Sequence, residues 1–530
     1  MAAATSQGAA VRGQPEEAAM TTRQWLAVFG AILGAFMAIL DIQISNASIR
    51  EITGGLGATI EDGSWISTSY LVAEIIIIPL SGWLTRVLSL RTYLIWTSSF
   101  FLFFSMCCGF AWNLQSMIVF RALQGLTGGA LIPLAFAVML SLPPSRRTIG
   151  MALFSVTATF APAVGPTVGG YLTETFGWQS VFFMNIVPGI AMMATVLYAI
   201  DREKGDRSLL KSIDLPGIIT MAIGLACLTI FLEEGERKDW FGSPLIVWLC
   251  AVSVVMLGSF FYIELKVTNA FINLRLLTQR NFGLGCLVNF VVGLAMYGAL
   301  YLLPLYLSEI QHYNASYIGR TMMFAGLPQL MIIPLVPILL KKIDGRWIAF
   351  VGINIFAISC YMNSHMTDLV GLEHLKWSQI VRAIGQPLLM VPLSTITTGL
   401  ILRSQAGSAS GLFNMLRNLG GSVGIAVLAT TLSMREKFHS AKLVEGITIY
   451  KLNTQNRLSI LQQGFMMQGL DPMLALRKAE LVIDAAVRKQ ATVMAFNDCF
   501  LCVGVALTCS SILILLCKKV APATGPSEAH

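Results

Sequence analysis

The sequence predicts an all-α polytopic membrane protein whose chain crosses the bilayer about fourteen times. Of its 530 residues, 55% are hydrophobic and 12% are charged, whereas roughly a quarter of the residues of a soluble domain are charged. Fourteen apolar runs are long enough to cross the ~30 Å hydrocarbon core as helices. These runs lie at 26–48, 65–85, 92–111, 115–140, 148–172, 180–200, 213–233, 244–264, 283–307, 317–340, 347–363, 378–402, 407–433 and 496–517.

The distribution of Lys and Arg residues predicts that both termini are cytoplasmic. With the N-terminus inside, the inner segments carry nineteen of these residues and the short outer loops carry four, namely Arg50, Arg237, Lys238 and Lys376. Positive residues are retained on the cytoplasmic side, and long segments such as 434–495 are exempt from this rule. We therefore expect a protein of the inner (cytoplasmic) membrane with cytoplasmic tails at 1–24 and 518–530.

The composition argues against several other classes of protein. The net charge of +8 is explained by the cytoplasmic loops, so nucleic-acid binding is not expected. The ten cysteines lie in or beside apolar runs, which is typical of packing residues. The sequence contains no His-Glu-x-x-His motif and no Cys/His cluster with zinc spacing, so neither a metal site nor an enzyme is expected.

An internal repeat divides the apolar runs into two halves. Residues 84–91 resemble 339–346 and residues 121–125 resemble 382–386, at offsets of 255 and 261 residues. We expect an N-terminal six-helix half at 25–200 and a C-terminal six-helix half at 283–517. An inserted helix pair with its flanking loops occupies 201–282. Two parallel halves with a binding site at their interface are a transporter design.

Three ionisable residues inside the predicted helices are candidates for proton coupling. Asp41 lies late in the first run, Glu74 lies in the middle of the second, and Arg121 opens the fourth. A charged group at such a position costs at least ~2.5 kcal/mol, which makes it a functional candidate. Burial raises the pKa of a carboxylic acid and a guanidinium lowers it, as a reversible proton carrier requires. The alternative for Asp41 is a helix cap at the interface or an inert ion pair.

Two arginines of the second half are candidates for the charge-holding role that we expect for Arg121. An arginine stays protonated, so Arg382 and Arg417 can hold a carboxylate or a substrate in place. Arg417 lies just before three glycines, at 420, 421 and 424. For this residue, contact with a lipid headgroup or a cytoplasmic loop is an open alternative.

The fifth apolar run contains an unusual group of prolines and glycines. Each proline removes a helical hydrogen bond and is expected to bend the helix. Glycines four residues apart expose one helix face, so that another helix can approach closely. We expect a bent, closely packed helix at Pro162, Gly165, Pro166, Gly169 and Gly170.

The segment 434–495 is predicted to lie outside the cytoplasm. Asp471 and Pro472 form a helix start, with a capping carboxylate and a proline at the first turn. The apolar residues that follow recur at helical spacing, which predicts an amphipathic helix leading to the last span. This helix is either a solvated spacer or a docking surface for an outer partner.

These motifs resemble the major facilitator superfamily, and in particular the EmrB-type exporters of its fourteen-span drug:proton antiporter branch. Residues 40–47 look like the first-helix signature of that branch. The other matching motifs are the second-to-third helix motif with Gly82, Arg86 and Arg91, the fourth-helix motif with Arg121, Gln124 and Gly125, and the fifth-helix exporter motif from Pro162 to Gly170.

Four residues depart from the usual pattern of the family. Arg86 replaces an acidic residue and Ser89 replaces a glycine in the second-to-third helix motif. Gln43 replaces a common threonine and Arg50 a common proline in the first-helix signature.

The resemblance implies proton-driven export of hydrophobic or amphipathic small molecules by alternating access, with Asp41 as a coupling carboxylate. No cofactor beyond the proton gradient is implied. The implied partners are the substrate, the lipid bilayer, and a periplasmic adaptor protein with an outer-membrane channel that engage the protein through loop 434–495.

Other functions are alternatives of lower rank. An exporter dedicated to one metabolite or siderophore would have the same fold. A proton-channel subunit of a membrane complex would need buried lysines in broken helices. A membrane-embedded acyl- or glycosyltransferase would need a His/Asp pair at a membrane face. Neither of these two patterns occurs in the predicted spans.

Overall fold

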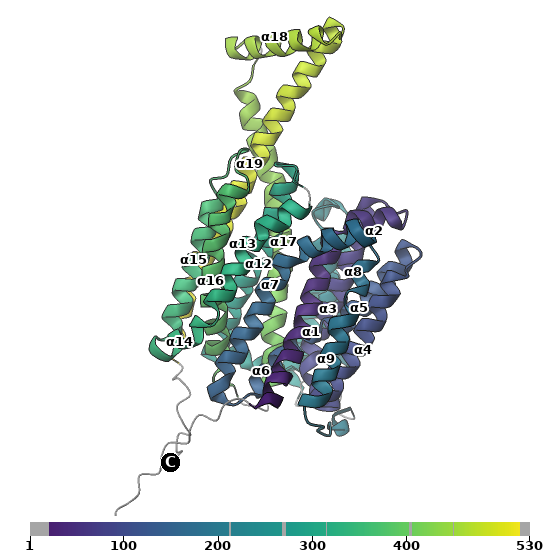
Figure 1. Cartoon of the computed structure of the whole chain (residues 1–530), viewed down its shortest axis with the longest axis vertical. Coiled ribbons are helices and arrows are strands. Elements are labelled where there is room, and N and C mark those ends of the chain that lie inside the picture. Colours follow the sequence, from purple (N-terminus) through teal and green to yellow (C-terminus); the bar gives the residue numbers. More distant parts are fainter. Residues whose placement is uncertain are drawn as a thin grey trace, which may run out of the picture.

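The computed structural model of the chain is a bundle of long helices (Figure 1). It describes residues 21–210, 214–267, 272–313, 315–401, 405–448 and 450–519. The predicted cytoplasmic tails therefore lie almost entirely outside the described residues, and their placement stays a prediction.

The helices of the structure agree with the predicted all-α membrane protein of about fourteen spans. Within the described residues, twelve helices are long and apolar enough to cross a bilayer, and a thirteenth span results if α13 and α14 are taken together. These two helices are bent by 49° at the break between them. The remaining predicted run, 148–172, lies within the 33-residue helix α7.

The helices of the first half follow one another with short connections. The fourth predicted run is divided into α5 and α6, and the sixth into α8 and α9. The bounds are α1 (Thr22–Ala47), α2 (Ile49–Gly55), α3 (Ile60–Leu88), α4 (Leu90–Gly109), α5 (Leu114–Gly128), α6 (Leu131–Ser141), α7 (Pro144–Phe176), α8 (Ser180–Phe183) and α9 (Ile186–Ala199).

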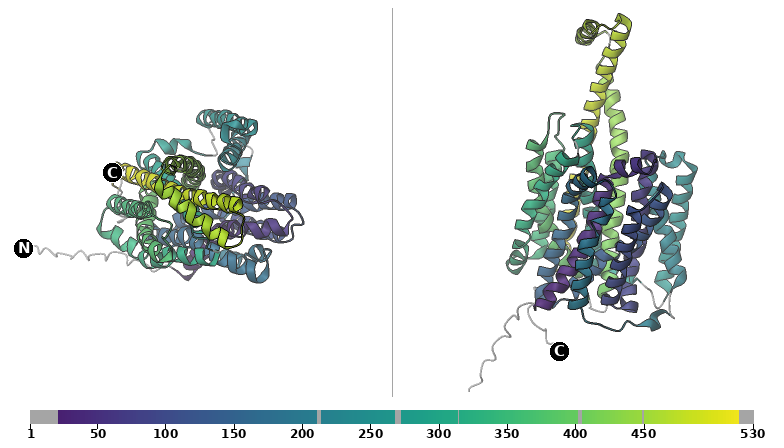
Figure 2. Two further views of the ribbon diagram at one scale, coloured as in Figure 1. Left: turned by 90° about the horizontal axis from the view of Figure 1, so that it is seen from above. Right: turned by 45° about the vertical axis from the view of Figure 1, so that its right-hand side comes forward.

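The second half stands beside the first in the view from above (Figure 2). Between the two halves in sequence come α10 (Leu215–Glu234) and α11 (Pro244–Lys266), which pack on each other, while α10 also contacts α3 and α17. The helices of the second half are α12 (Arg280–Glu309), α13 (Ala315–Ile332), α14 (Leu335–Lys342), α15 (Gly345–Asn363), α16 (Leu372–Thr398), α17 (Ala406–Glu445), α18 (Leu452–Met467) and α19 (Pro472–Leu515).

The segment 434–495 is not a loop but a helical hairpin, which corrects its predicted character. Helix α17 continues beyond the predicted end of its span to Glu445, and α19 is one helix from Pro472 to Leu515. The predicted helix start is confirmed, because the Asp471 side chain accepts a hydrogen bond from the backbone N–H of Met473 at 3.0 Å. No proline interrupts either helix at the predicted membrane boundary, so both extend into the hairpin.

The two ends of the bundle differ: one holds the two ends of the described chain and the other holds the helical hairpin. The start of α1 and the end of α19 lie at one end, here called the terminal face, and α18 with the start of α19 projects beyond the other end, the hairpin face (Figures 1 and 2). At the terminal face the halves touch through α3 and α17: a Cβ atom on Gly82 would lie 2.5 Å from the carbonyl carbon of Gly407. The Ser410 hydroxyl donates to the carbonyl of Pro133 at 3.0 Å. The halves are therefore closed against each other at the terminal face.

Ser89, between α3 and α4, adopts a backbone conformation that favours glycine. Its φ is +72° and its side chain is buried. Residues other than glycine have a steric cost in this region of positive φ. The Ser89 hydroxyl donates a hydrogen bond to Oγ1 of Thr92 at 3.0 Å, which partly offsets that cost. Serine is therefore accommodated at this position, where the resembled motif has glycine, at the cost of backbone strain in the short connection between α3 and α4.

Candidate functional site

Asp41 and Arg121, which are eighty residues apart in sequence, form a buried ion pair. The distance from Arg121 Nη1 to Asp41 Oδ2 is 2.7 Å, and both side chains are at most 1% exposed. The other carboxylate oxygen of Asp41 accepts hydrogen bonds from Gln124 Nε2 at 3.1 Å and from Asn185 Nδ2 at 2.6 Å. Because Asp41 lies inside α1 and is fully enclosed, the interpretation as a helix cap at the interface is wrong.

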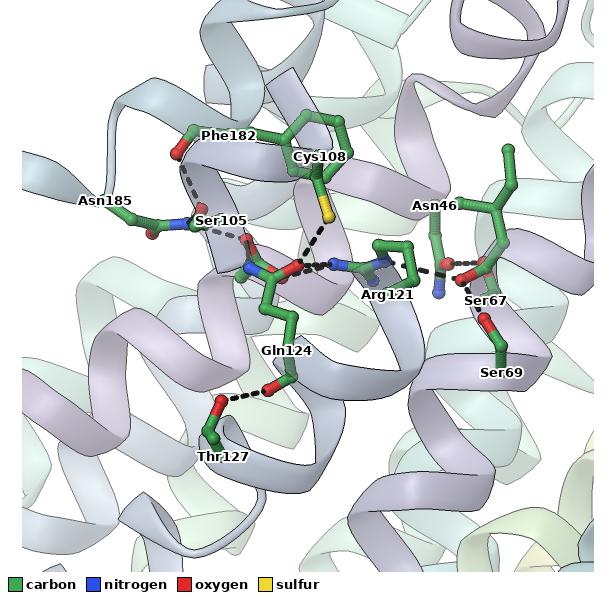
Figure 3. Close-up of polar contacts among 12 residues, drawn as sticks. Asn46, Ser67, Ser69, Ser105, Cys108, Arg121, Gln124, Thr127, Phe182 and Asn185 are labelled. Atoms are coloured by element: carbon green, nitrogen blue, oxygen red, sulfur yellow. Dashed lines mark hydrogen bonds and ion pairs between the residues drawn. The ribbon is translucent and has the colours of Figure 1, made fainter. Parts of the chain in front are cut away.

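Helix α5 places Arg121 and Gln124 on the same side because residues three apart share a helix face. The helix begins at Asn113, whose side chain accepts a hydrogen bond from the backbone N–H of Ser116 at 2.7 Å. Figure 3 shows Arg121 and Gln124 side by side on this helix, with Ser105 and Asn185 approaching from neighbouring segments. Asn185 also donates to the Ser105 hydroxyl at 3.1 Å.

The Arg121 guanidinium has further partners besides the Asp41 carboxylate. It donates to Gln124 Oε1 at 2.8 Å and, through Nε, to the carbonyl of Ile66 at 3.3 Å. Its central carbon lies 4.4 Å from the centre of the Tyr70 ring, at cation–π distance. A buried ion pair is tolerated only when further hydrogen bonds satisfy both partners, and this pair meets that condition.

The glycines of the fifth-helix motif bring α7 against the part of α1 that carries Asp41. A Cβ atom on Gly165 would lie 2.5 Å from Cβ of Gln43, and one on Gly169 would lie 3.1 Å from Cγ2 of Ile44. Gly170 is also buried. The predicted close packing is present, and α7 runs through Pro162 and Pro166 as a single helix.

The fourth-helix glycine has the same structural role. A Cβ atom on Gly125 would collide with the carbonyl oxygen of Tyr70. Helix α5 can therefore lie directly against the backbone of α3, one turn from Arg121.

A cavity of about 640 Å³ lies between the two halves. Its walls come from α1, α3 and α7 of the first half and from α12, α13 and α17 of the second. Residues at the end of α1 and at the start of α13 line it, so it extends towards the hairpin face. Both prolines of the fifth-helix motif, Pro162 and Pro166, also line it.

Glu74 and Arg417 face this cavity from opposite halves. Glu74 Oε1 accepts a hydrogen bond from Asn418 Nδ2 at 3.4 Å, and Asn418 Oδ1 accepts one from the Tyr297 hydroxyl at 3.3 Å. Arg417 Nη2 donates a hydrogen bond to Asn414 Oδ1 at 2.9 Å. Both charged residues line the cavity and are 4% exposed. The alternative of a lipid headgroup or a cytoplasmic loop for Arg417 is therefore wrong.

The remaining predicted residues lie away from this cavity. Arg382 is buried in α16, and no carboxylate of the described residues forms an ion pair with it. Arg86 is exposed at the end of α3, where its carbonyl accepts a hydrogen bond from the backbone N–H of Asp206 at 3.0 Å, and Arg91 is half-buried in α4. The roles of these three arginines stay predictions.

Three polar residues of the site were not predicted from the sequence. Asn185 lies in the apolar run 180–200, and a polar amide in such a run was the one sign in the sequence that pointed to it. Asn418 follows Arg417 directly and shares its cavity. Glu233 lies at the end of the seventh predicted run and lines the same cavity from α10. An ionisable residue so close to a membrane span was a usable signal for this third residue.

Comparisons with known proteins identify relatives along most of the chain. Residues 31–425 match the family described as Major Facilitator Superfamily. The colistin resistance protein EmrB of Acinetobacter baumannii is 34% identical over 93% of this chain and 96% of its own length. The multidrug export protein EmrB of Escherichia coli is 32% identical over 81% of this chain and 84% of its own.

A third relative and a solved structure extend the comparison. The fatty acid resistance protein FarB of Neisseria gonorrhoeae is 30% identical over 88% of this chain and 91% of its own. The crystal structure of the human organic anion transporter MFSD10 superposes with a TM-score of 0.57 at 14% identity, covering 92% of this chain and all of that one. At that identity the likeness concerns the fold alone.

Proposed function

Because this chain belongs to the Major Facilitator Superfamily and, within it, to the EmrB-type exporters, we propose that it exports hydrophobic or amphipathic small molecules in exchange for protons. The observation that carries the proposal is the cavity between the halves, with Glu74 in its wall and the buried Asp41–Arg121 pair behind its α1 wall. A cavity at the interface of two parallel halves is where such transporters bind their substrates.

The orientation of the protein in the membrane follows from the charge distribution. The positive residues predict that the terminal face is cytoplasmic and that the protein lies in the inner membrane. In the described conformation the halves meet at Gly82 and Gly407, and the cavity extends towards the hairpin face. This arrangement supports an outward-facing state of an alternating-access cycle. The inward-facing state requires the halves to separate at the terminal face and to close at the other.

Proton coupling is assigned to Asp41 and Glu74. A proton that enters from the hairpin face reaches Glu74 through the cavity. Neutralisation of this carboxylate weakens its hydrogen bond with Asn418, which joins α3 to α17 at the cavity. Asp41 is closed off by Arg121, Gln124 and Asn185 in this state, so its protonation requires α1 and α5 to separate. Each carboxylate thus links its charge to a contact between helices.

The lining of the cavity supports a broad range of hydrophobic substrates. Flexible methionines and aromatic rings adapt to different shapes, and Met296, Met322, Tyr297 and Tyr301 line this cavity. The named relatives confer resistance to colistin and to fatty acids, two chemically different classes. An exporter dedicated to one metabolite or siderophore is the alternative, and efflux of only one compound from a set of chemically different compounds would favour it.

Efflux from intact cells tests the proposal. Cells that carry the native chain are expected to lose a fluorescent hydrophobic dye rapidly, and an uncoupler is expected to stop that loss. The Glu74→Gln variant should lower the initial efflux rate by roughly tenfold or more, because the exchangeable proton is removed from the cavity. Glu480→Gln, an exposed carboxylate of the hairpin, is the control and should export normally. Efflux that continues in the uncoupler would refute proton coupling.

We also propose that the hairpin binds a periplasmic adaptor protein that leads to an outer-membrane channel. The hairpin projects beyond the bundle (Figure 1), and apolar side chains on its surface are open to solvent. Leu474 is 51% exposed and Leu481 is 66% exposed, both on α19. Exposed apolar residues in a solvated helix favour a protein partner over a spacer.

Cross-linking to the adaptor tests this partner. Deletion of residues 455–490 is expected to abolish cross-links while the truncated protein still inserts in the membrane. The double variant Leu474→Ser/Leu481→Ser should weaken cross-linking several-fold, since it removes exposed apolar contacts without shortening the hairpin. Glu480→Gln on the same helix is the matched control. Cross-linking that is unchanged by the deletion would exclude the hairpin as the docking surface.

A further inference from the structure

The inserted helix pair reaches both halves of the protein at the hairpin face. Glu234, at the end of α10, accepts a hydrogen bond from the Ser64 hydroxyl of α3 at 3.0 Å. Just after α10, Trp240 Nε1 donates to Thr430 Oγ1 of α17 at 3.0 Å. These contacts hold the end of α10 at the gap between the halves, where Glu233 becomes part of the cavity wall.

Glu233 differs from its neighbour in having one carboxylate oxygen without a hydrogen-bond partner among the residues that the structure describes. Glu234 forms an ion pair with Arg237 at 3.2 Å, so the nearest cation in sequence is already engaged. Glu233 forms no ion pair among the described residues, and its Oε1 atom is buried without a hydrogen-bond partner. A buried carboxylate oxygen without a partner costs free energy, and a bound cation recovers that cost.

The charges around the cavity have an excess of carboxylates. Two guanidinium groups line it, those of Arg50 and Arg417. The carboxylates that line it are those of Glu51, Glu74, Glu174 and Glu233. Four carboxylates against two guanidiniums give a negative interior when all are ionised, which attracts positive and repels negative ligands.

Aromatic side chains of the same cavity also favour a positively charged ligand. Tyr297, Tyr301 and Tyr313 line the cavity, and the faces of aromatic rings attract organic cations. An organic anion would have Arg417 as its counter-charge in the inner part of the cavity, but the Glu74 carboxylate lines the same part of the cavity and repels an anion when it is ionised. The wall is therefore better suited to a hydrophobic molecule with a positive charge than to one with a negative charge.

Building on the proposed export function, we propose that Glu233 of the inserted helix pair makes this cavity bind amphipathic cations more tightly than anions of the same shape. The carboxylate contacts the positive group of the substrate, while the methionine and tyrosine side chains contact its apolar part. The inserted pair thereby contributes a specificity-determining residue to the transport site.

Binding of two probes of nearly equal shape and opposite charge tests this inference. Tetraphenylphosphonium and tetraphenylborate are titrated into the purified full-length protein, and the quenching of tryptophan fluorescence gives each Kd. The native protein should bind the cation more tightly than the anion. Glu233→Gln should raise the Kd of the cation by roughly tenfold and leave that of the anion unchanged or lower. Glu236→Gln, three residues on and outside the cavity wall, is the matched control.

The results distinguish this inference from the proposed function. Binding is measured without a proton gradient, so it does not depend on coupling. Equal weakening of both probes by Glu233→Gln, no weakening of either, or the same loss in Glu236→Gln would overturn the role of Glu233. Uncoupler-resistant efflux with an intact cation preference would instead overturn proton coupling and leave the specificity assignment standing.

Discussion

The Asp41→Asn variant is expected to abolish proton-driven export and to destabilise the protein. The substitution leaves the Arg121 guanidinium buried without its carboxylate, and breaking a buried ion pair costs about 3–5 kcal/mol. Efflux in intact cells measures the first effect. The unfolding temperature of the purified protein in detergent, compared with that of the native chain, measures the second.

A double variant separates the two effects. Asp41→Asn/Arg121→Gln removes both charges, so it should recover much of the lost thermal stability. Export should remain abolished, because no titratable group is left at this position. If the double variant regains uncoupler-sensitive export together with stability, Asp41 is a structural ion-pair partner and Glu74 alone carries the coupling.

Gly165→Leu is expected to block transport without preventing membrane insertion. Even a single Cβ atom would lie 2.5 Å from Cβ of Gln43, so a leucine must push α1 away from α7. The displaced stretch of α1 carries Asp41, two residues before Gln43, and its contact with Arg121 depends on that position. Overpacking of this kind typically costs 1–3 kcal/mol. The initial efflux rate is expected to fall by roughly tenfold or more.

Gly258→Leu is the matched control for this substitution. Gly258 lies in α11, and a Cβ atom there would have no neighbour within 4 Å. The same change in side-chain volume should therefore leave both efflux and insertion unaltered. Normal efflux by Gly165→Leu would show that the glycines of the fifth-helix motif serve ordinary packing.

The sequence was sufficient to predict the general architecture and the charged residues of the site. A charged group inside a membrane span costs free energy. Asp41, Glu74, Arg121 and Arg417 could therefore be chosen as candidates from their positions in the predicted spans alone. Fold class was equally accessible because every long apolar run must become a helix in a bilayer. The hairpin was predicted only in part: its helix start at Pro472 is local, whereas its length depends on two helices that continue across the predicted membrane boundary.

The partners of these residues could not be predicted because they come from distant parts of the chain. Asn185 contacts Asp41 across 144 residues, and Asn418 contacts Glu74 across 344 residues. Helical periodicity describes contacts within one helix, so it carries no information about such pairs. Glu233 could have been noted as an ionisable residue at the end of a span, but its place in the cavity wall depends on how α10 packs between the two halves.

Coupled fluxes in proteoliposomes test the central claim of proton-driven export most directly. The purified protein is reconstituted with a pH-sensitive dye inside, and a substrate found in the cell assay is added with no imposed gradient. We predict that movement of the substrate drives protons in the opposite direction, and that Asp41→Asn and Glu74→Gln each reduce this proton flux. Substrate movement by the native protein without any proton flux, and at a rate that an imposed pH gradient does not change, would contradict the account.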